Sequence, residues 1–259
     1  AIISKKLVTL KNDAPVESKL PEFELKQIDK DKLYKFLREM EFNRLLSSAI
    51  SLYGEPDLSI KNDPEKKKSR HEKPISKKNY HLITDIKEID NWIKDAEEAG
   101  EVAFDTETSS LDPHQANLIG VSLSSKIGKA CYIPIGHNSK KCINIDAVLR
   151  KLKPLLEDSS IKKIGQNIKY DFIVLFKHGI IINSMEDTML MSYVLDAGKN
   201  RHNMDTLSEI HLNHKTIAFK DLVGSGKKEI NFRDVDVEKA KDYAAEDADV
   251  TYRLYKKFH

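Results

Sequence analysis

The chain has 259 residues, 43 of them basic and 41 acidic, and an apolar fraction of 40%. This predicts one large domain with a substantial core, or one domain plus an extension, and the nearly neutral charge does not by itself indicate a nucleic-acid partner. We expect no transmembrane helix, no signal peptide and no structural zinc site held by cysteines, because long apolar runs and zinc-ligand cysteine spacings are absent, and we expect reduced thiols in a cytoplasmic protein.

The first 55 residues predict an extended lead followed by helices. Apolar residues recur at helical spacing between residues 33 and 49, and Gly54 and Pro56 end this pattern. Because the chain starts without Met and in mid-pattern, we expect it to be a fragment of a longer protein.

Residues 56–79 predict a flexible basic linker, because they are polar, proline-dotted and rich in lysine. A solvated tether is favoured over a DNA contact for this stretch. The expected organisation is therefore an extension at 1–55, a linker at 56–79 and a main domain at 80–259.

Strand and helix patterns alternate from residue 80 onward. A first helix is expected to begin near Asp85, with Glu88 in a capping box, and to end at Gly100. Further strands are expected at 102–106, 118–123, 131–134 and 161–165, and helices at 145–156, 167–178, 187–195, 205–212 and 237–257. This order predicts an α/β domain with a central mixed β-sheet flanked by helices.

Asp105 and Glu107 follow the apolar run Val102-Ala103-Phe104. Side chains alternate along a strand, so these two carboxylates point the same way at its end. Mg²⁺ and Mn²⁺ prefer oxygen ligands of this kind. Taken alone, however, one such pair is more typical of a solvated strand end.

Two later patterns contain further carboxylates. Asn167 is expected to cap the helix that carries Asp171. Tyr243 and Asp247 are four residues apart and lie on one helix face. Ala244, Ala245 and Ala248 keep neighbouring positions small, so this helix can approach the sheet closely, whereas Glu246 and Asp249 are expected at the solvated surface. Each pattern alone is also ordinary helix structure.

In this order, the three patterns resemble the motifs of DEDD-type 3′–5′ exonucleases, in the subgroup with Tyr in the third motif. The segments IGQNIKYDFIVL, EDTMLMSYVLDAGKNRHNMDTLSE, HKTIAF and YAAEDADVTYRLY are similar to the proofreading domain of bacterial DNA polymerase I. The resemblance covers about residues 80–259, and residues 1–55 resemble the segment that follows the 5′-nuclease core of those polymerases.

This resemblance implies a ribonuclease H-like exonuclease fold with a short, mainly helical amino-terminal extension. It also implies two divalent metal ions, Mg²⁺ or Mn²⁺, with Zn²⁺ as an alternative at one site. The implied catalytic and metal-binding residues are Asp105, Glu107, Asp171 and Asp247, with Tyr243 orienting the nucleophilic water. Asp105, Glu107 and Asp247 would hold one metal, and Asp105 would share the second, with Asp171 nearby.

The implied substrate is a single-stranded or frayed DNA 3′ end, from which nucleoside 5′-monophosphates are removed in proofreading. The implied substrate-binding residues are Thr108, Leu111, Gln166, Asn167, Tyr170, Arg201 and Phe219. For Leu111 and Phe219 a place in the core is the alternative, and for Arg201 a surface salt bridge. The implied partner is a polymerase domain in the full-length chain, and we expect a monomer associated with the nucleoid and not with a membrane.

Three other functions are alternatives to a DNA exonuclease. An RNA 3′ exonuclease of the RNase D type carries the same catalytic motifs. A catalytically silent scaffold domain would have lost carboxylates, and all four are present here. A metal-free single-strand binding module is disfavoured by the excess of acidic over basic residues between positions 82 and 259.

Overall fold

The computed structural model describes residues 2–10, 27–55, 79–226 and 229–259, together with residues 13, 15, 21, 24 and 75. The chain divides into two compact units, residues 1–66 and 67–259. Almost all of the predicted linker at 56–79 lies outside the described residues. Among those residues, no helix is long and apolar enough to cross a membrane.

The first unit is helical in its described parts. It contains α1 (Ile2–Val8), α2 (Lys30–Glu39) and α3 (Asn43–Tyr53). Helices α2 and α3 bury Tyr34, Leu37 and Ala49 between them, and α3 ends at Gly54 as expected. The predicted extended lead is wrong for α1, where Lys5 and Lys6 lie in the last turn and favour a helix by opposing its dipole.

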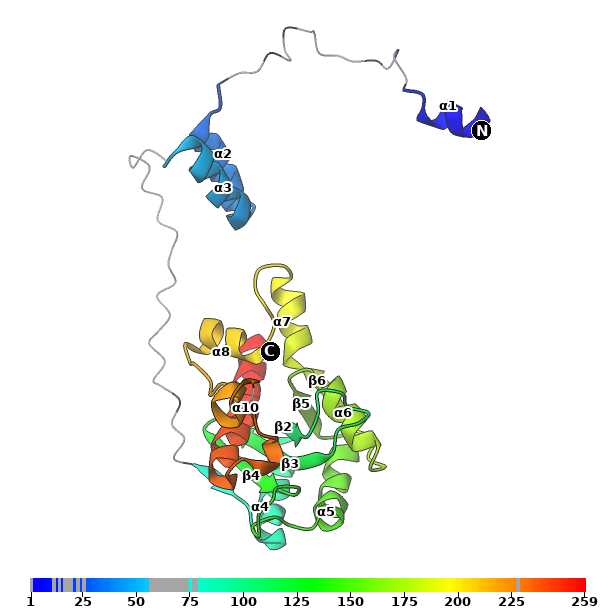
Figure 1. Ribbon diagram of the computed structural model, residues 1–259, viewed down its shortest axis with the longest axis vertical. Coiled ribbons are helices and arrows are strands. Elements are labelled where there is room, and N and C mark those ends of the chain that lie inside the picture. The colour runs from blue at the N-terminus through cyan, green and yellow to red at the C-terminus, as the bar shows by residue number, and fades with distance from the viewer. Residues whose placement is uncertain are drawn as a thin grey trace. The chain divides into compact units, whose positions relative to one another are not determined.

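The second unit is built on a six-stranded mixed sheet (Figure 1), in the order β1-β4-β3-β2-β5-β6. Its strands are β1 (Tyr80–Leu82), β2 (Glu101–Thr108), β3 (Leu118–Lys126), β4 (Lys129–Pro134), β5 (Lys162–Gly165) and β6 (Met185–Asp187). Strands β2, β3 and β4 are antiparallel neighbours, whereas β1 is parallel to β4, and β5 is parallel to both β2 and β6. The predicted mixed sheet is thus confirmed.

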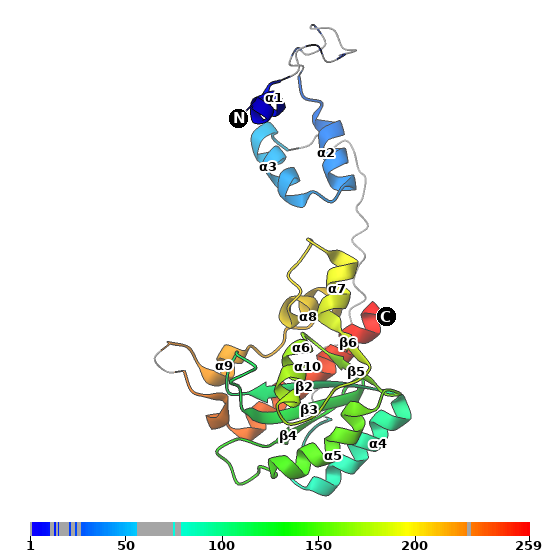
Figure 2. The same cartoon turned by 90° about the vertical axis from the view of Figure 1, so that its right-hand side faces the viewer.

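Helices cover both faces of this sheet (Figure 2). They are α4 (Ile89–Ala99), α5 (Ile145–Glu157), α6 (Lys169–Phe176), α7 (Thr188–Asp196), α8 (Met204–Leu212), α9 (Phe219–Val223) and α10 (Val237–Phe258), with short 3₁₀ turns η2 (Ile86–Glu88) and η4 (Phe232–Asp234). Asp85 caps η2, where its side chain accepts from the backbone N–H of Lys87, and α4 starts only at Ile89. Glu88 lies at the N-cap position of α4 without a side-chain cap hydrogen bond, so the expected capping box is wrong, whereas the helix ends at Gly100 as expected, with φ of +68°.

Strand β2 shows how the two faces differ. Val102 and Phe104 belong to the main core with residues of α4 and α5. Ala103, between them, packs with Tyr252 and Tyr255 of α10 on the opposite face. Because side chains alternate between the two faces along a strand, Asp105 and Glu107 point to the same face as Ala103, toward α10.

Edge strands β1 and β6 and the short helix α9 were not predicted. The strands have three residues each and α9 has five. Segments of that length contain too few residues to show a period of 2 or 3.6. The longer elements were predicted to within a few residues of their ends.

Candidate active site

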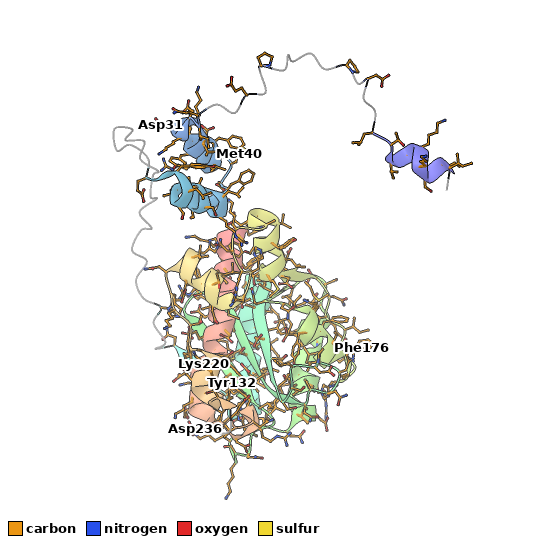
Figure 3. The ribbon with its side chains drawn as sticks, turned by 45° about the horizontal axis from the view of Figure 1, so that its top comes forward. Asp31, Met40, Tyr132, Phe176, Lys220 and Asp236 are labelled. Atoms are coloured by element: carbon orange, nitrogen blue, oxygen red, sulfur yellow. The ribbon has the colours of Figure 1, made fainter. Side chains whose placement is uncertain are left out.

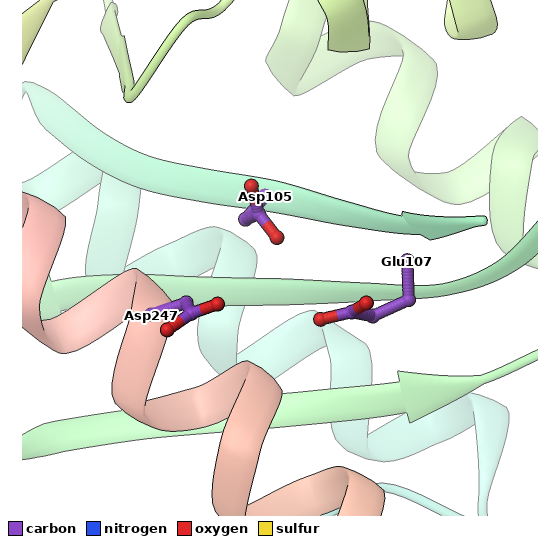
Figure 4. A group of neighbouring side chains, drawn as sticks. All are labelled: Asp105, Glu107 and Asp247. Carbon is purple, nitrogen blue, oxygen red and sulfur yellow. The ribbon is translucent and has the colours of Figure 1, made fainter. Parts of the chain in front are cut away.

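Three carboxylates meet between β2 and α10. One ligand atom from each of Asp105, Glu107 and Asp247 lies within 4.8 Å of the others. Figure 4 shows the three side chains converging, two from the strand and one from the helix. Asp105 is half-buried, whereas Glu107 is 6% and Asp247 is 7% exposed. The alternative of a solvated strand end is therefore excluded for this pair.

Small residues allow the helix and the strands to approach each other here. Ala244, Ala245 and Ala248 are fully buried on α10, as predicted. On β3, Gly120 pairs with Glu107 across the sheet. A Cβ atom at Gly120 would lie 2.1 Å from the hydroxyl of Tyr132, which is labelled in Figure 3. Glycine is thus required at position 120 for the Tyr132 ring to lie against it.

Asp171 reaches the same strand from α6 but lies outside the three-carboxylate group. It is 2% exposed. Its Oδ1 accepts hydrogen bonds from the backbone N–H of Thr106, at 3.0 Å, and from the Thr106 hydroxyl, at 2.5 Å. The structure therefore places the fourth predicted carboxylate beside β2, between the positions of Asp105 and Glu107 along the chain.

The carboxylates of this cluster repel one another when they are ionised. Burial raises the pKa of Asp105 to about 8, and the charge of Asp247 adds to this. Burial also raises the pKa of Glu107 well above its usual range, assisted by the charges of Asp105, Asp247 and Asp171. The pKa of Asp171 is raised by burial and by Asp105, although its bonds with Thr106 act the other way. A bound cation would relieve this repulsion.

Tyr243 lies one helical turn before Asp247 on α10. Burial raises the pKa of its phenol far above 10, and so do the charges of Asp247, Glu107 and Asp105 and a hydrogen bond with Asp247. The hydroxyl therefore keeps its proton at neutral pH. It can hold a polar group in place by hydrogen bonding, but it is unsuited to act as a base.

The predicted helix cap at Asn167 is wrong. Asn167 adopts a left-handed conformation, with φ of +62°, and α6 starts two residues later. The Asp187 carboxylate instead accepts hydrogen bonds from the N–H groups of Asn167 (2.9 Å) and Ile168 (3.1 Å). Asp187 is also the N-cap of α7. An acidic residue at the start of a helical pattern is the sequence signal for that cap.

The residues predicted to bind substrate near the first motif form one group. The hydroxyls of Thr108 and Tyr170 are 2.5 Å apart, and Tyr170 also donates to the carbonyl of Ser110. Leu111, in the same loop, is 95% exposed. The alternative that Leu111 belongs to the core is therefore excluded.

The other predicted contacts come from different segments. Gln166 is turned into the protein: its Nε2 donates to the carbonyl of His202 at 2.8 Å, and its Oε1 accepts from Thr188 at 2.5 Å. Arg201 precedes His202 and is exposed. Phe219 is 46% exposed, and its ring centre lies 6.0 Å from that of Tyr243.

Glu246 and Asp249 are fully buried, which corrects the expectation that they lie at the solvated surface. Asp249 accepts hydrogen bonds from Tyr80, Gly128 and Arg253. Glu246 accepts from the side chain of His214 and the backbone of Ile217. These donors are distant in sequence, apart from Arg253, and they offset the cost of burying the charge.

Comparison with known proteins supports the interpretation of these motifs. A family model described as 3′–5′ exonuclease matches residues 80–259. DNA polymerase I of Pseudomonas aeruginosa is 39% identical over 98% of this chain, and that of Rhizobium leguminosarum is 45% identical over 70% of it. The chain spans 28% and 20% of the lengths of these two relatives.

A solved structure shows the same fold. Trypanosoma brucei RNase D superposes with a TM-score of 0.55 over 71% of this chain and 64% of that one, at 14% sequence identity. At this identity the likeness concerns the fold alone. Together with the mixed sheet, it confirms the expected ribonuclease H-like exonuclease fold.

Proposed function

The chain belongs to the family of 3′–5′ exonuclease domains of DNA polymerase I, and from this premise we propose that it removes nucleoside 5′-monophosphates from single-stranded or frayed DNA 3′ ends. In a longer protein, a polymerase domain would supply mismatched ends to it. A mismatched terminus unpairs more readily than a matched one, and this difference is the physical basis of proofreading.

The observation that carries the proposal is the convergence of Asp105, Glu107 and Asp247. Their ligand atoms lie within 4.8 Å of one another, and Asp171 is bonded to the same strand. A catalytically silent scaffold has no need for a set of mutually repelling, buried carboxylates. Such a set is instead suited to hold divalent ions against a phosphodiester.

The residues fit a divalent metal. Glu107 Oε1 is buried and has no hydrogen-bond partner among the described residues. The ligand atoms of the three-carboxylate group are all oxygens, which Mg²⁺ and Mn²⁺ prefer, with Zn²⁺ as the alternative at one site. Two ions bound here, with Asp171 near the second, would lower the pKa of the attacking water and stabilise the leaving 3′-oxygen.

Tyr243 would orient the nucleophile. Its protonated hydroxyl lies beside the carboxylates and can accept or donate a hydrogen bond without losing its proton. Glu107 is the second group placed to orient the water. In this role Tyr243 acts through geometry, and its removal would slow the reaction without changing which proton acceptor is used.

The remaining predicted residues would bind the strand end. We assign Leu111 to a wedge against the terminal bases, because a large apolar side chain at 95% exposure is available to a ligand. Phe219 would stack on a base, and Arg201 would pair with a phosphate. Thr108, Asn167 and Tyr170 would contact the same 3′ end of the DNA. Gln166 would act indirectly, by holding the backbone next to Arg201.

The test is digestion of end-labelled single-stranded DNA and RNA with Mg²⁺ or Mn²⁺, followed by addition of a chelator. We expect stepwise shortening of DNA from its 3′ end, stopped by the chelator and abolished in Asp247→Asn. Asp146→Asn is the matched control, because Asp146 is an exposed residue of α5. Cleavage that survives the chelator, or RNA cut much faster than DNA, would overturn the proposal.

A further inference from the structure

We propose that Glu246 is a positioning residue that holds Phe219 against Tyr243, and so sets how the terminal base of the substrate stacks. The inference rests on the proposed function, because it concerns the same strand end. It assigns a role to a buried carboxylate that is adjacent to Asp247 but is absent from the three-carboxylate group.

Glu246 is fully buried on α10, with 0% exposure. One carboxylate oxygen accepts from His214 Nε2 at 2.9 Å, and the other accepts from the backbone N–H of Ile217 at 2.6 Å. Both donors belong to the segment 213–218, which joins α8 to α9. A buried carboxylate with two donors in one segment ties that segment tightly to the helix.

Other hydrogen bonds hold the same segment at its start. Ser208 Oγ donates to the carbonyl of His214 at 2.8 Å, and Thr216 Oγ1 donates to Asp205 at 2.6 Å. Segment 213–218 is thus joined to α8 on one side and, through Glu246, to α10 on the other. The bond at Ile217 is the last of these before Phe219.

Phe219 is the first residue of α9 and lies in a group of aromatic rings. Its ring stacks on Phe232 with a centroid distance of 5.9 Å and an interplanar angle of 7°. The Tyr243 ring lies 6.0 Å from Phe219 and 6.2 Å from Phe232. A shift of segment 213–218 would therefore move a ring that contacts the residue proposed to orient the nucleophile.

Two functions meet at Phe219 in this arrangement. Because its side chain is 46% exposed, it remains available to a base. Its contact with Tyr243 connects the stacked base to the reacting end of the strand. Glu246 would thereby set the distance between the base-binding surface and the carboxylates, although it touches neither the substrate nor the reacting atoms.

Glu246→Gln replaces a carboxylate, whose two oxygens both accept hydrogen bonds, with a side chain of the same size. A glutamine amide has one oxygen and one NH₂ group, so it cannot accept from both His214 and Ile217. We expect KM for single-stranded DNA to rise about tenfold, the size of effect that loss of base stacking gives, with a smaller change in kcat. Glu209→Gln is the matched control, because Glu209 is exposed on α8. His214→Asn is a milder variant in case Glu246→Gln folds poorly.

A double-mutant cycle separates positioning from general destabilisation. If Glu246 acts through Phe219, Glu246→Gln should change kcat/KM less than twofold in a Phe219→Ala background. A fluorescent base analogue at the 3′ terminus should also show weaker stacking in Glu246→Gln. An equal loss in both backgrounds, or unchanged stacking in the single variant, would overturn the inference and leave the proposed function intact.

Amide hydrogen exchange distinguishes failure of the inference from failure of the proposed function. In the full 259-residue chain, exchange at residues 217–219 should accelerate in Glu246→Gln and stay unchanged in Glu209→Gln. If the wild-type chain does not shorten DNA, the proposed function fails, and this exchange measurement alone decides the positioning role. Unchanged exchange at Ile217 would then overturn it.

Discussion

The carboxylate of Asp171 accepts hydrogen bonds from both the backbone N–H and the hydroxyl of Thr106. Strand β5 pairs with β2 only from Glu101 to Ala103. Beyond that point, Asp171 occupies an edge position of β2 that a neighbouring strand would otherwise take. The same contact fixes α6 next to the strand that carries Asp105 and Glu107. The Asp171 side chain therefore both satisfies a backbone N–H of β2 and positions α6 at the candidate site.

Thr106→Val should weaken both stability and metal binding. Valine keeps the shape of threonine but removes the hydroxyl donor to Asp171, and a hydrogen bond to a charged group contributes about 1.5–3 kcal/mol. We expect a comparable loss in the free energy of unfolding in urea and a weaker Mn²⁺ titration. Thr84→Val, at an exposed position, is the control. An unchanged Mn²⁺ affinity would show that Asp171 does not depend on this bond for its position.

The free energy of unfolding of the metal-free protein should decrease as pH rises, because of Asp105. Its pKa in the folded chain is about 8, against an ordinary value of 3.8. Between these values the unfolded chain has lost the proton that the folded chain keeps, so unfolding becomes easier as pH rises. Each unit of pKa difference corresponds to about 1.4 kcal/mol. We expect the loss to exceed about 1.4 kcal/mol in urea titrations with chelator between pH 5 and 8.

Histidines titrate in the same range with the opposite sign, so this measurement needs a control. Burial lowers the pKa of His137, His178 and His211, and their contribution to stability therefore rises with pH. Asp105→Asn retains these histidines, so the difference between wild type and variant reports Asp105 together with its effect on the pKa values of Glu107 and Asp171. This difference should shrink when Mg²⁺ is added. A difference that is independent of pH would contradict the raised pKa.

The site residues differ in how far the sequence predicted them. Asp105, Glu107 and Asp247 lie on β2 and α10, whose residues follow their periods over many positions, and the structure brings these residues together as expected. Asp171 and Glu246 depend on donors more than 25 residues away. No local pattern records such donors, so the hydrogen bonds that hold these two side chains in place could not be predicted from the sequence.

The main disagreements have the same physical origin. Glu246 and Asp249 were expected in solvent because isolated charges are costly to bury. The structure supplies donors from β1, from the turn after β3 and from segment 213–218. The cap at Asn167 was wrong for a related reason, since Asp187 satisfies the N–H groups that a capping side chain would bind.

Tyr243→Phe should lower kcat with little change in KM. The ring and its packing against Phe219 and Phe232 stay, while the hydroxyl proposed to orient the water is lost. Misplacing a reacting group by about 1 Å can reduce a rate about 100-fold, and we expect a loss of this order in single-turnover digestion. Tyr193→Phe is the control, because Tyr193 is exposed on α7. A loss confined to KM would instead assign Tyr243 to substrate binding.

Leu111→Ala should leave stability unchanged but alter substrate preference. The side chain is 95% exposed, and substitution of such surface residues changes stability by about 0.5 kcal/mol or less. If Leu111 separates the terminal bases, the variant should digest paired or mismatched duplex ends more slowly while its rate on single strands changes little. Leu52→Ala, at an exposed position of α3, is the control. Equal losses on single-stranded and duplex substrates would contradict the wedge, because a residue that only binds the strand acts on both.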